Sequence, residues 1–377
     1  MSRRIMYVTG TRADYGLMRH TLRAIDRHPD LALILVVTGM HLDPGFGDTV
    51  SEVEADGFEI AARVPVAAGG TGAAMAHGIA TMIAGFTDAF ALARPDLVLL
   101  LGDRGEMLAG AIAAIHLNIP VAHIHGGERS GTVDEPVRHA ISKLSHLHLT
   151  ATEEAQNRLV RMGEHAGHVF VVGAPGLVGL RDEPDTDRAA LIRDHGLDAA
   201  RRIALLIYHP VLQEAETGAD AIGAILDALL ANELQIVALL PNADGGGAAI
   251  REVLLSRSAR DADLQVHTHF ARPTFVAWMA AADVMVGNSS AGIIEAATFG
   301  TPVVNIGSRQ ALRQRNDNVV DVADDFHAVR EGVERALALG PLPFRNIYGD
   351  GATADRVATL LARVPLGADL LSKRNDY

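Results

Sequence analysis

The chain has 377 residues, of which 49% are hydrophobic and 21% charged, so it can form two folded domains and general disorder is excluded. Its formal net charge of -13 argues against a general nucleic-acid binder, because the surface as a whole repels phosphate. It contains no cysteine, which excludes disulfides, thiolate nucleophiles and cysteine-ligated zinc.

The N-terminus gives no sign of a targeting segment. It reads Met-Ser-Arg-Arg and continues into an apolar run that is too short for the core of a signal peptide. No apolar run approaches about 20 residues, the length of a membrane span. We therefore expect a soluble, cytoplasmic protein without nucleic-acid or membrane partners.

Short apolar runs alternate with longer helical patterns in the first half of the chain. Several of these runs are apolar on both faces, as buried parallel strands are. The patterns Tyr15–His28 and Gly105–Asn118 indicate crossover helices. The predicted strands are Ile5–Gly10, Leu31–Gly39, Leu97–Gly102, Pro120–His125, Leu147–Thr150 and Val169–Gly173.

A stretch with glycines, two prolines and a charge run, Ala174–Arg188, interrupts this alternation and predicts a linker. The two successive α/β series predict Rossmann-like, doubly wound parallel-sheet domains at 1–175 and 176–349. A helical pattern at Ala354–Val364 lies in the segment 350–377, which is free to pack on either domain and is grouped with the first. The second series of strands is Ile203–Tyr208, Gln235–Leu240, Leu264–His267, Val284–Gly287 and Pro302–Ile306.

Polar side chains follow the apolar runs of the first domain. Ligands bind beyond the carboxyl ends of the strands in open parallel sheets, so these positions are candidate site residues. Each residue alone is equally consistent with a helix cap, a turn or a salt bridge, and their shared location favours a functional group. The residues are Arg12, Asp14, Asp103, Arg104, His125, Glu128, Asp134 and His139.

In the second domain the segment Gly287–Gly292 joins a strand to a helix that is predicted to start near Ser290. The free N–H groups at such a helix start favour a phosphate, and Glu295 could reach the hydroxyls of a ribose. The alternative is that Ser289 or Ser290 only caps the helix. Neither a P-loop nor a GxGxxG motif is present. Further candidates for nucleotide or anion binding are His209, Asn242, Arg309 and Arg313.

Two histidine pairs raise the question of a metal site. His123 and His125 are two apart on a predicted strand, so they are expected to share a face, and His146 and His148 repeat the spacing. Such a pair can ligate zinc, but no third ligand stands at a diagnostic spacing. Acid–base or core histidines are therefore favoured, and no metal is expected.

Seven motifs together resemble the hydrolysing UDP-N-acetylglucosamine 2-epimerases, in the bacterial branch that serves sialic and legionaminic acid synthesis. They are VTGTRADYG, VTGMHLD, LGDR, HIHGGE, DEPVRHAISKLSHLH, GNSSAGIIEA and NIGSRQ, and they run in order from about residue 5 to residue 320. The resemblance implies a GT-B fold with the active site in the cleft between two domains. It also implies no metal and no nicotinamide cofactor.

The resemblance also implies a reaction. A base removes the proton at sugar C2 while UDP leaves C1, and water then adds to the resulting 2-acetamidoglucal to give N-acetylmannosamine and UDP. By motif match the group that binds UDP would be Arg12, Arg104, His209, Ser289, Ser290, Glu295 and Arg309. The acid–base and sugar-binding group would be Asp14, Asp103, Glu128, Asp134 and His139. Histidine at position 125 resembles the bacterial hydrolysing branch, so an imidazole or Glu128 would move the proton there.

Several alternatives stay open at this point. The runner-up is a hydrolysing 2-epimerase of UDP-2,4-diacetamido-2,4,6-trideoxyglucose, as in the legionaminic acid pathway, which shares these motifs. A non-hydrolysing epimerase or a GT-B glycosyltransferase fits less well, as do a non-catalytic nucleotide-sugar sensor and a metallohydrolase that uses the histidine pairs. A homo-oligomer, dimer or tetramer, is expected.

Overall fold

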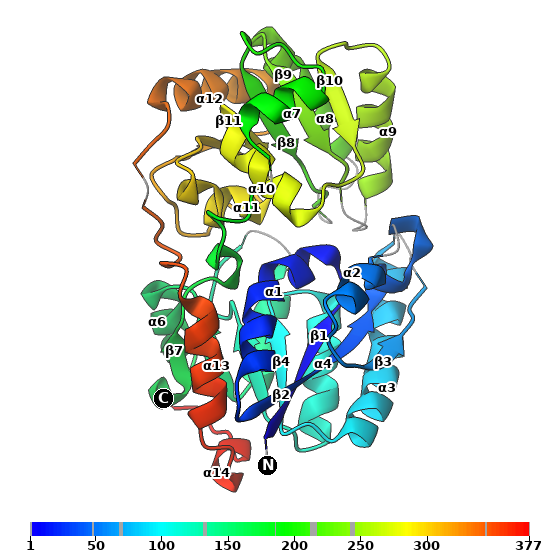
Figure 1. Ribbon diagram of the computed structural model, residues 1–377, viewed down its shortest axis with the longest axis vertical. Helices are drawn as coiled ribbons and strands as arrows, with labels where there is room; N and C mark the ends of the chain where they lie inside the picture. Colours follow the sequence, from blue (N-terminus) through cyan, green and yellow to red (C-terminus); the bar gives the residue numbers. More distant parts are fainter. Residues whose placement is uncertain are drawn as a thin grey trace. The chain divides into compact units, whose positions relative to one another are not determined.

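The computed structural model describes residues 2–46, 49–67, 71–130, 134–184, 186–211, 217–241, 246–343 and 345–376. The chain divides into two compact units (Figure 1). Unit 1 consists of Met1–Glu128, Asp134–Val178 and Tyr348–Tyr377, and unit 2 of Arg129–Val133 and Gly179–Ile347. The main passage from unit 1 to unit 2, at Val178, falls inside the glycine- and proline-containing stretch of the sequence.

Over the described residues, unit 1 contains a seven-stranded sheet with the order β3-β2-β1-β4-β5-β6-β7, and every strand pair in it is parallel. The central strands are buried on both faces, which explains their unbroken Val, Ile and Leu content. The strands are β1 (Arg3–Thr9), β2 (Leu31–Thr38), β3 (Ile60–Val64), β4 (Leu97–Leu101), β5 (Val121–Ile124), β6 (Leu147–Thr150) and β7 (Val169–Val171).

Helices cover both faces of this sheet. The α-helices are α1 (Arg12–Arg27), α2 (Val50–Ala55), α3 (Gly72–Ala93), α4 (Gly105–His116), α5 (Asp134–Leu144), α6 (Glu153–Arg161), α13 (Thr353–Arg363) and α14 (Ala368–Leu371). Short 3-10 segments are η1 (Gly39–Leu42), η2 (Pro44–Phe46), η3 (Ala166–His168) and η4 (Pro175–Leu177).

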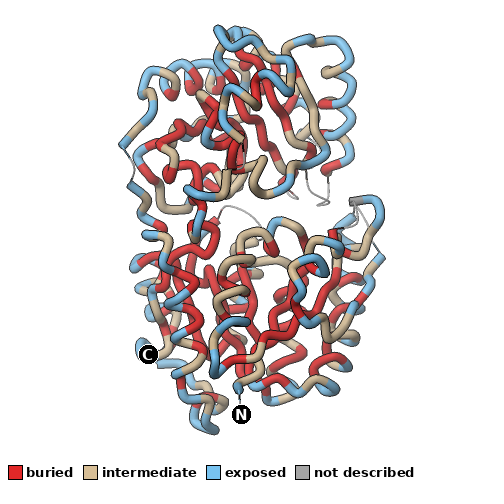
Figure 2. The backbone as a smooth tube through the Cα atoms, viewed as in Figure 1, coloured by how far each residue is buried: buried red, intermediate tan, exposed pale blue. Residues whose placement is uncertain are grey.

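Two hydrophobic cores hold unit 1 together. On one face, Leu22 of α1 and Leu361 of α13 share a core with β1 and β2. On the other face, Phe86 of α3 and Met107 of α4 pack with the same strands. Figure 1 shows α13, in red, beside α1, in blue, and Figure 2 shows the buried strands between the helix layers. Helix α13, from the C-terminal part of the chain, therefore shares one hydrophobic core with α1 and β1 from the N-terminal part.

Within the described part of the chain, one helix, α3, is long and apolar enough to cross a membrane on length and composition alone. It contains Thr81, Thr87 and Asp88, so it is no continuous apolar run. Its side chains Met82, Phe86 and Phe90 are buried against the sheet. This packing identifies α3 as a helix that covers the sheet.

Unit 2 repeats the architecture. Its described residues form a six-stranded parallel sheet with the order β10-β9-β8-β11-β12-β13. The strands are β8 (Ile203–Ile207), β9 (Gln235–Leu239), β10 (Leu264–His267), β11 (Val284–Gly287), β12 (Val303–Ile306) and β13 (Val319–Val322). The helices are α7 (Arg188–Asp194), α8 (Gly218–Ala231), α9 (Gly247–Ser258), α10 (Arg272–Ala281), α11 (Ser290–Ile294), α12 (Phe326–Leu339) and the 3-10 segment η6 (Ala296–Thr298).

The cores of unit 2 also lie on both faces of its sheet. Ile225 of α8 and Val333 of α12 pack on one face, and Trp278 of α10 and Leu191 of α7 pack on the other. Trp278 is fully buried. The predicted fold class, two doubly wound parallel-sheet domains, is confirmed.

Candidate functional site

The first polar group of unit 1 stands where β1 passes into α1. Thr11 caps α1, and Asp14 closes a capping box with it. Asp14 Oδ1 accepts from Thr11 N at 2.6 Å and Thr11 Oγ1 at 2.7 Å, and Oδ2 accepts from Thr9 Oγ1 at 2.6 Å. Tyr7 OH also donates to Oδ2, at 3.2 Å. Both oxygens of this buried carboxylate are therefore occupied by protein donors.

A histidine extends this group from the next strand. His41, on η1 after β2, places Nε2 3.0 Å from Thr9 Oγ1 and Nδ1 2.7 Å from Thr49 Oγ1. Burial lowers the pKa of His41, so the ring is neutral at pH 7. Because Thr9 donates to Asp14, the Nε2–H of His41 donates to Thr9, and a hydrogen-bonded chain runs from the imidazole to the carboxylate.

The two predicted arginines of the unit 1 strand ends are each next to a carboxylate. Arg12 Nη2 lies 2.5 Å from Glu52 Oε1 on α2. Arg104, the N-cap of α4, places Nε 3.3 Å from Oε1 of Glu106. Glu106 lies so close to β1 that a β-carbon on Gly10 would come within 2.7 Å of its Cγ, which explains the glycine at this position. Both guanidinium groups are partly exposed, so an anionic ligand can reach them.

A buried arginine organises the residues that follow β4 and β5. Arg138 of α5 is fully buried and forms an ion pair with Asp103. Its Nη1 donates to the main-chain carbonyl of Glu128 at 3.1 Å. One guanidinium therefore holds both the loop after β4 and the loop after β5.

His125 and Glu128 form a second pair in the same loop. Nδ1 of His125 is in hydrogen-bond contact with Oε1 of Glu128, and both side chains are almost fully buried. His125 has a φ of 62°, a left-handed conformation that is uncommon outside glycine. This turn takes His125 off β5, which ends at Ile124, so His125 does not share a strand face with His123 as expected. A carboxylate beside an imidazole can move a proton.

The start of α5 carries the remaining predicted residues of unit 1. Asp134 opens the helix, where a carboxylate is favoured by the helix dipole. His139 Nε2 lies 3.6 Å from Oε1 of Glu135, one turn earlier in the helix. Burial lowers the pKa of His139 although Glu135 opposes this, so His139 is neutral at pH 7 and able to accept a proton.

His123 is a core histidine beneath this group. Its Nε2 donates to the carbonyl of Gly102 at 2.7 Å, and its Nδ1 lies 3.1 Å from Ser142 Oγ. Burial lowers the pKa of His123 to about 3, so the ring stays neutral. The side chain supports the loop before Asp103 and does not titrate near neutral pH.

In unit 2 an asparagine joins several predicted binding residues. Asn288 Oδ1 accepts from the main-chain N of His209 at 2.7 Å, and its Nδ2 donates to the His209 carbonyl at 2.8 Å. The Asn288 carbonyl accepts from Arg309 Nη1 at 3.1 Å and from Gln310 Nε2 at 3.3 Å. The next residue, Ser289, caps α11. The loop after β8, the loop after β11 and the loop after β12 therefore meet at one buried residue, Asn288, through its side chain and its main-chain carbonyl.

The other predicted residues of unit 2 have different surroundings. Ser290 begins α11, which has only five residues and so contributes a weak dipole. Glu295 is buried, and its Oε1 lies 2.5 Å from Nη2 of Arg272, so the carboxylate predicted for ribose is held by a guanidinium. Arg313 follows β12 in the segment of Arg309, and its main-chain N donates to Gln310. Asn242 lies outside the described residues.

The family model described as UDP-N-acetylglucosamine 2-epimerase matches residues 23–362. The chain belongs to this family. A Legionella pneumophila protein named UDP-N,N'-diacetylbacillosamine 2-epimerase (hydrolyzing) is 50% identical to it over 378 residues, with 100% of both chains covered. A Neisseria meningitidis protein named UDP-N-acetylglucosamine 2-epimerase is 34% identical over 358 residues, which cover 93% of this chain and 92% of that one.

Among solved structures, the S. aureus MnaA–UDP co-structure matches with a TM-score of 0.82 at 19% identity and covers 100% of both chains. This similarity supports the GT-B fold of the epimerase. The family match and the 50% identical relative show that the chain is an enzyme of the hydrolysing 2-epimerase kind.

The histidine pairs of the epimerase do not form a metal centre in the part of the chain that the structure describes, where no group of three or more possible ligands is close enough to hold an ion. His123 contacts Gly102, and His125 contacts Glu128. His148 Nε2 lies 2.8 Å from Glu164 Oε2. Each ring nitrogen named here has a protein partner.

Several residues that hold the predicted site residues in place were not themselves predicted from the sequence. Three of them lie inside motifs identified in the sequence: His41 in VTGMHLD, Arg138 in DEPVRHAISK and Asn288 in GNSSAG. His41 and Asn288 also follow strands, and this position could have identified them. Arg138 lies on a helix, four residues after Asp134, which places both on one face. Arg272 opens α10 far from these motifs, and nothing in the sequence links it to Glu295.

Proposed function

We propose that this epimerase acts on UDP-2,4-diacetamido-2,4,6-trideoxyglucose, which is UDP-N,N'-diacetylbacillosamine, and releases UDP and the C2-inverted 2,4-diacetamido-2,4,6-trideoxymannose. The observation that supports this substrate is the 50% identity, over the full length of both chains, to a protein named for it. The relative named for UDP-N-acetylglucosamine is 34% identical. The product has the chemistry of a precursor for legionaminic-type nonulosonic acids.

The reaction needs proton transfer at a carbon that is not acidic. In the first step the C2–H and C1–O bonds break, the proton passes to a base, and UDP leaves with the electron pair of the C1–O bond. In the second step water adds across the glycal. Its oxygen bonds to C1, and C2 receives a proton on the face opposite to the one from which the first proton was removed. The sum is substrate plus water giving free sugar plus UDP, and both steps need positioned acid–base groups.

We assign the proton transfers to the unit 1 group. His125 with Glu128, and His139 with Glu135, each place an imidazole beside a carboxylate. Asp103 and Asp134 complete the acidic set, with Asp103 fixed by Arg138. Asp14 has both oxygens occupied by protein donors, which favours a role in shaping the loop for substrate over a role as base.

We assign UDP binding to the unit 2 residues His209, Ser289, Ser290, Glu295, Arg309, Arg313 and Asn242, together with Arg12 and Arg104 of unit 1. Main-chain N–H groups, hydroxyls and guanidinium groups stabilise the charge that develops on a leaving diphosphate. The arrangement of three loops around Asn288 supports this assignment, because it fixes His209 and Arg309 beside the serines.

A second candidate substrate is UDP-N-acetylglucosamine, which would give N-acetylmannosamine for sialic-type acid synthesis. The 34% identical Neisseria relative favours it. The two substrates differ only at C4 and C6 of the sugar, so the chemistry at C1 and C2 is the same.

The proposal includes a cytoplasmic enzyme that works without a metal and assembles as a dimer or tetramer. Size-exclusion chromatography with light scattering measures the assembly, and activity in the presence of EDTA tests the absence of a metal requirement. A monomer, or loss of turnover with EDTA, would overturn that part.

The experiment is incubation of the purified protein with each UDP-sugar in D2O, followed by NMR. Expected products are free UDP and a manno-configured sugar with deuterium at C2, with kcat/KM at least about tenfold higher for the diacetamido substrate. A product sugar still attached to UDP would refute the hydrolysing reaction. A preference for UDP-N-acetylglucosamine would replace the first substrate by the second.

A further inference from the structure

A cluster of charged and polar side chains lies where the carboxyl end of α5 meets His148 of β6 and the C-terminal tail. Its centre is Glu164, which is only 2% exposed. Glu164 Oε1 lies 2.7 Å from Lys143 Nζ, and Oε2 lies 2.6 Å from Lys373 Nζ. His148 also contacts Oε2, at 2.8 Å. One buried carboxylate therefore binds two lysines, and one of them comes from the end of the chain.

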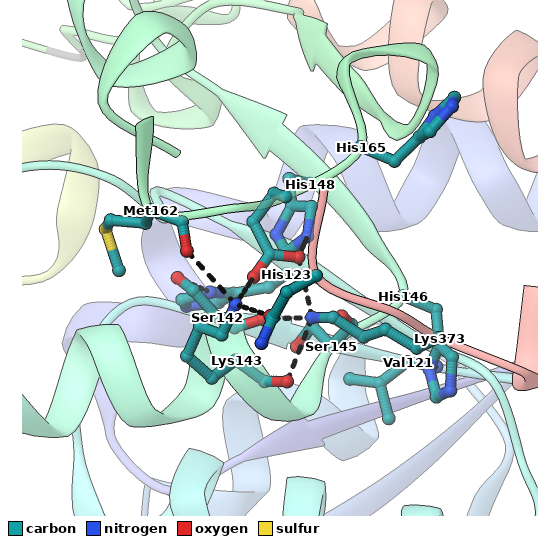
Figure 3. A network of polar contacts seen from close by, with 12 residues as sticks. Val121, His123, Ser142, Lys143, Ser145, His146, His148, Met162, His165 and Lys373 are labelled. Carbon is teal, nitrogen blue, oxygen red and sulfur yellow. Dashed lines mark hydrogen bonds and ion pairs between the residues drawn. The ribbon is translucent and has the colours of Figure 1, made fainter. Parts of the chain in front are cut away.

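Lys373 makes further contacts with the end of α5. Its Nζ lies 3.0 Å from the carbonyl of Ser142 and 2.9 Å from that of Lys143, and it also contacts the carbonyl of Ser145. Figure 3 shows the side chain of Lys373 extended toward these residues. The last carbonyls of a helix have no partner within the helix and carry its negative pole, so an ammonium group is well placed there.

Two more contacts hold the tail that carries Lys373. Lys143 Nζ lies 2.6 Å from Asn375 Oδ1, and the main-chain N of Asp376 donates to the carbonyl of Gly163 at 2.9 Å. Residues 373–376 have no helix or strand of their own. These contacts therefore fix the tail on α5 and on the loop before β7.

The same helix leads from this cluster to the candidate site. Arg138, one turn before Ser142, pairs with Asp103 and with the carbonyl of Glu128. Ser142 Oγ contacts His123, which donates to Gly102, the residue before Asp103. An α-helix moves as a stiff unit over a few turns, so a change at Ser142 is transmitted to Arg138. Both links converge on Asp103.

We propose that Lys373 is a positioning residue: by anchoring the carboxyl end of α5 to Glu164 and the C-terminal tail, it sets the place of Arg138 and thereby of Asp103 and Glu128. The inference rests on the proposed function. Desolvation offsets much of the attraction in a buried ion cluster, so the proposed role of the cluster is to fix geometry, although removal of one charged partner also lowers stability.

The test variant is Lys373→Met, which keeps the aliphatic stem and removes the charge. The control is Arg374→Met, the same change at the neighbouring exposed residue. For Lys373→Met we expect kcat to fall about tenfold or more with KM within about twofold, because small misplacements of reacting groups cost large factors in rate. Arg374→Met should match the wild type in both.

The pH profile of kcat separates positioning from a general loss of folded enzyme. A looser Arg138 stabilises the nearby carboxylates less in their ionised form, so the acid limb of Lys373→Met should move to higher pH by about half a unit. A smaller folded fraction lowers the whole profile and leaves the limb where it was. An unmoved limb, or unchanged kcat, would overturn the inference.

Hydrogen exchange gives a readout that does not need turnover. Amides of α5 should exchange faster in Lys373→Met while those of α4 stay as in the wild type, and equal acceleration in both helices would overturn the inference. If Lys373→Met does not fold, Asn375→Ala is measured instead. It removes only the tail contact to Lys143, and a smaller limb shift in the same direction supports the proposal, whereas an unmoved limb contradicts it.

Failure of the proposed function has a different signature. The wild-type protein would then release no UDP from either UDP-sugar. In that case the exchange of α5 against α4 still decides whether Lys373 anchors the helix.

Discussion

Arg138 is the residue on which the unit 1 group depends most. It is fully buried, and its charge is balanced by Asp103, whose side chain is 22% exposed. An uncompensated buried guanidinium is costly, so the ion pair holds Asp103 in place while part of its carboxylate stays exposed to solvent. Asp103 is therefore both held and accessible, as its proposed acid–base role requires.

At this scale we predict that Asp103→Asn keeps the fold and UDP binding but lowers turnover by about 10³-fold. The amide oxygen still accepts from Arg138, so the loop keeps its place, although loss of the counter-charge of Arg138 lowers stability. The side chain no longer carries a charge or exchanges a proton. Turnover is measured by UDP release, and UDP affinity by calorimetry. Asp26→Asn, on the exposed face of α1, is the control and should be fully active. Unimpaired turnover of Asp103→Asn would remove Asp103 from the acid–base group.

At the scale of elements, the start of α1 shows how a single carboxylate can order a strand end. Asp14 satisfies the cap of α1 through Thr11 and also contacts Thr9 and Tyr7 of β1. Other helices, such as α12 with Asp325 at its N-cap, use one exposed side chain for the same purpose. The larger set of contacts at Asp14 reflects a loop whose shape matters beyond the helix start.

The two caps allow a matched comparison. We expect Asp14→Ala to lower the free energy of unfolding by about 3 kcal/mol, because it removes a cap and leaves buried donors without an acceptor. Asp325→Ala should cost about 1 kcal/mol, the usual value of an exposed cap. Urea denaturation followed by far-UV circular dichroism measures both. Equal losses would contradict a special role for Asp14.

At the scale of the whole molecule, the inner parallel strands of the described sheets were readable from the sequence, whereas of the edge strands β7 and β10 were predicted and β3 and β13 were not. Val284–Gly287 was predicted with the bounds that the structure shows, because a strand buried on both faces is apolar throughout. Leu147–Thr150 was also predicted with its observed bounds, although this buried strand includes His148 and Thr150. Strands β3, Ile-Ala-Ala-Arg-Val, and β13, Val-Val-Asp-Val, were missed. Both lie at a sheet edge with half-exposed residues, so their sequences lack that signal.

Some residues of the candidate site could likewise be predicted from the sequence, and others could not. Position after a strand was enough to find Asp103, His125 and Glu128, since topology alone brings such residues to one edge of a sheet. Arg138 and Arg272 reach their carboxylate partners from helices, through side-chain directions that a single sequence does not show. Lys373 lies still further away, since it meets Ser142 across a sequence separation of 231 residues.

The buried histidines make the stability of the molecule depend on pH. Burial lowers the pKa of His123 to about 3 and that of His146 to about 4, from an ordinary value of 6.5. Between pH 6.5 and these values the unfolded chain binds protons that the native state does not, so the free energy of unfolding falls as the pH falls. Glu164 affects stability at lower pH. Burial alone would raise its pKa, but His148 and two lysines lower it from 4.5 to about 2. Its contribution to the free energy of unfolding is therefore present above pH 4.5 and is lost toward pH 2.

We therefore predict that the free energy of unfolding declines between pH 6.5 and pH 4, and that His146→Asn makes this decline shallower by up to about 3 kcal/mol. Asparagine does not titrate, and its Oδ1 can replace Nδ1 as acceptor for the Val121 N–H. Urea denaturation by far-UV circular dichroism at each pH measures the slope. The control His77→Asn, on the exposed face of α3, should leave the slope unchanged. Fluorescence of Trp278 reports on the unfolding of unit 2 in the same samples. An identical slope in His146→Asn and the wild type would show that folding does not lower the pKa of His146.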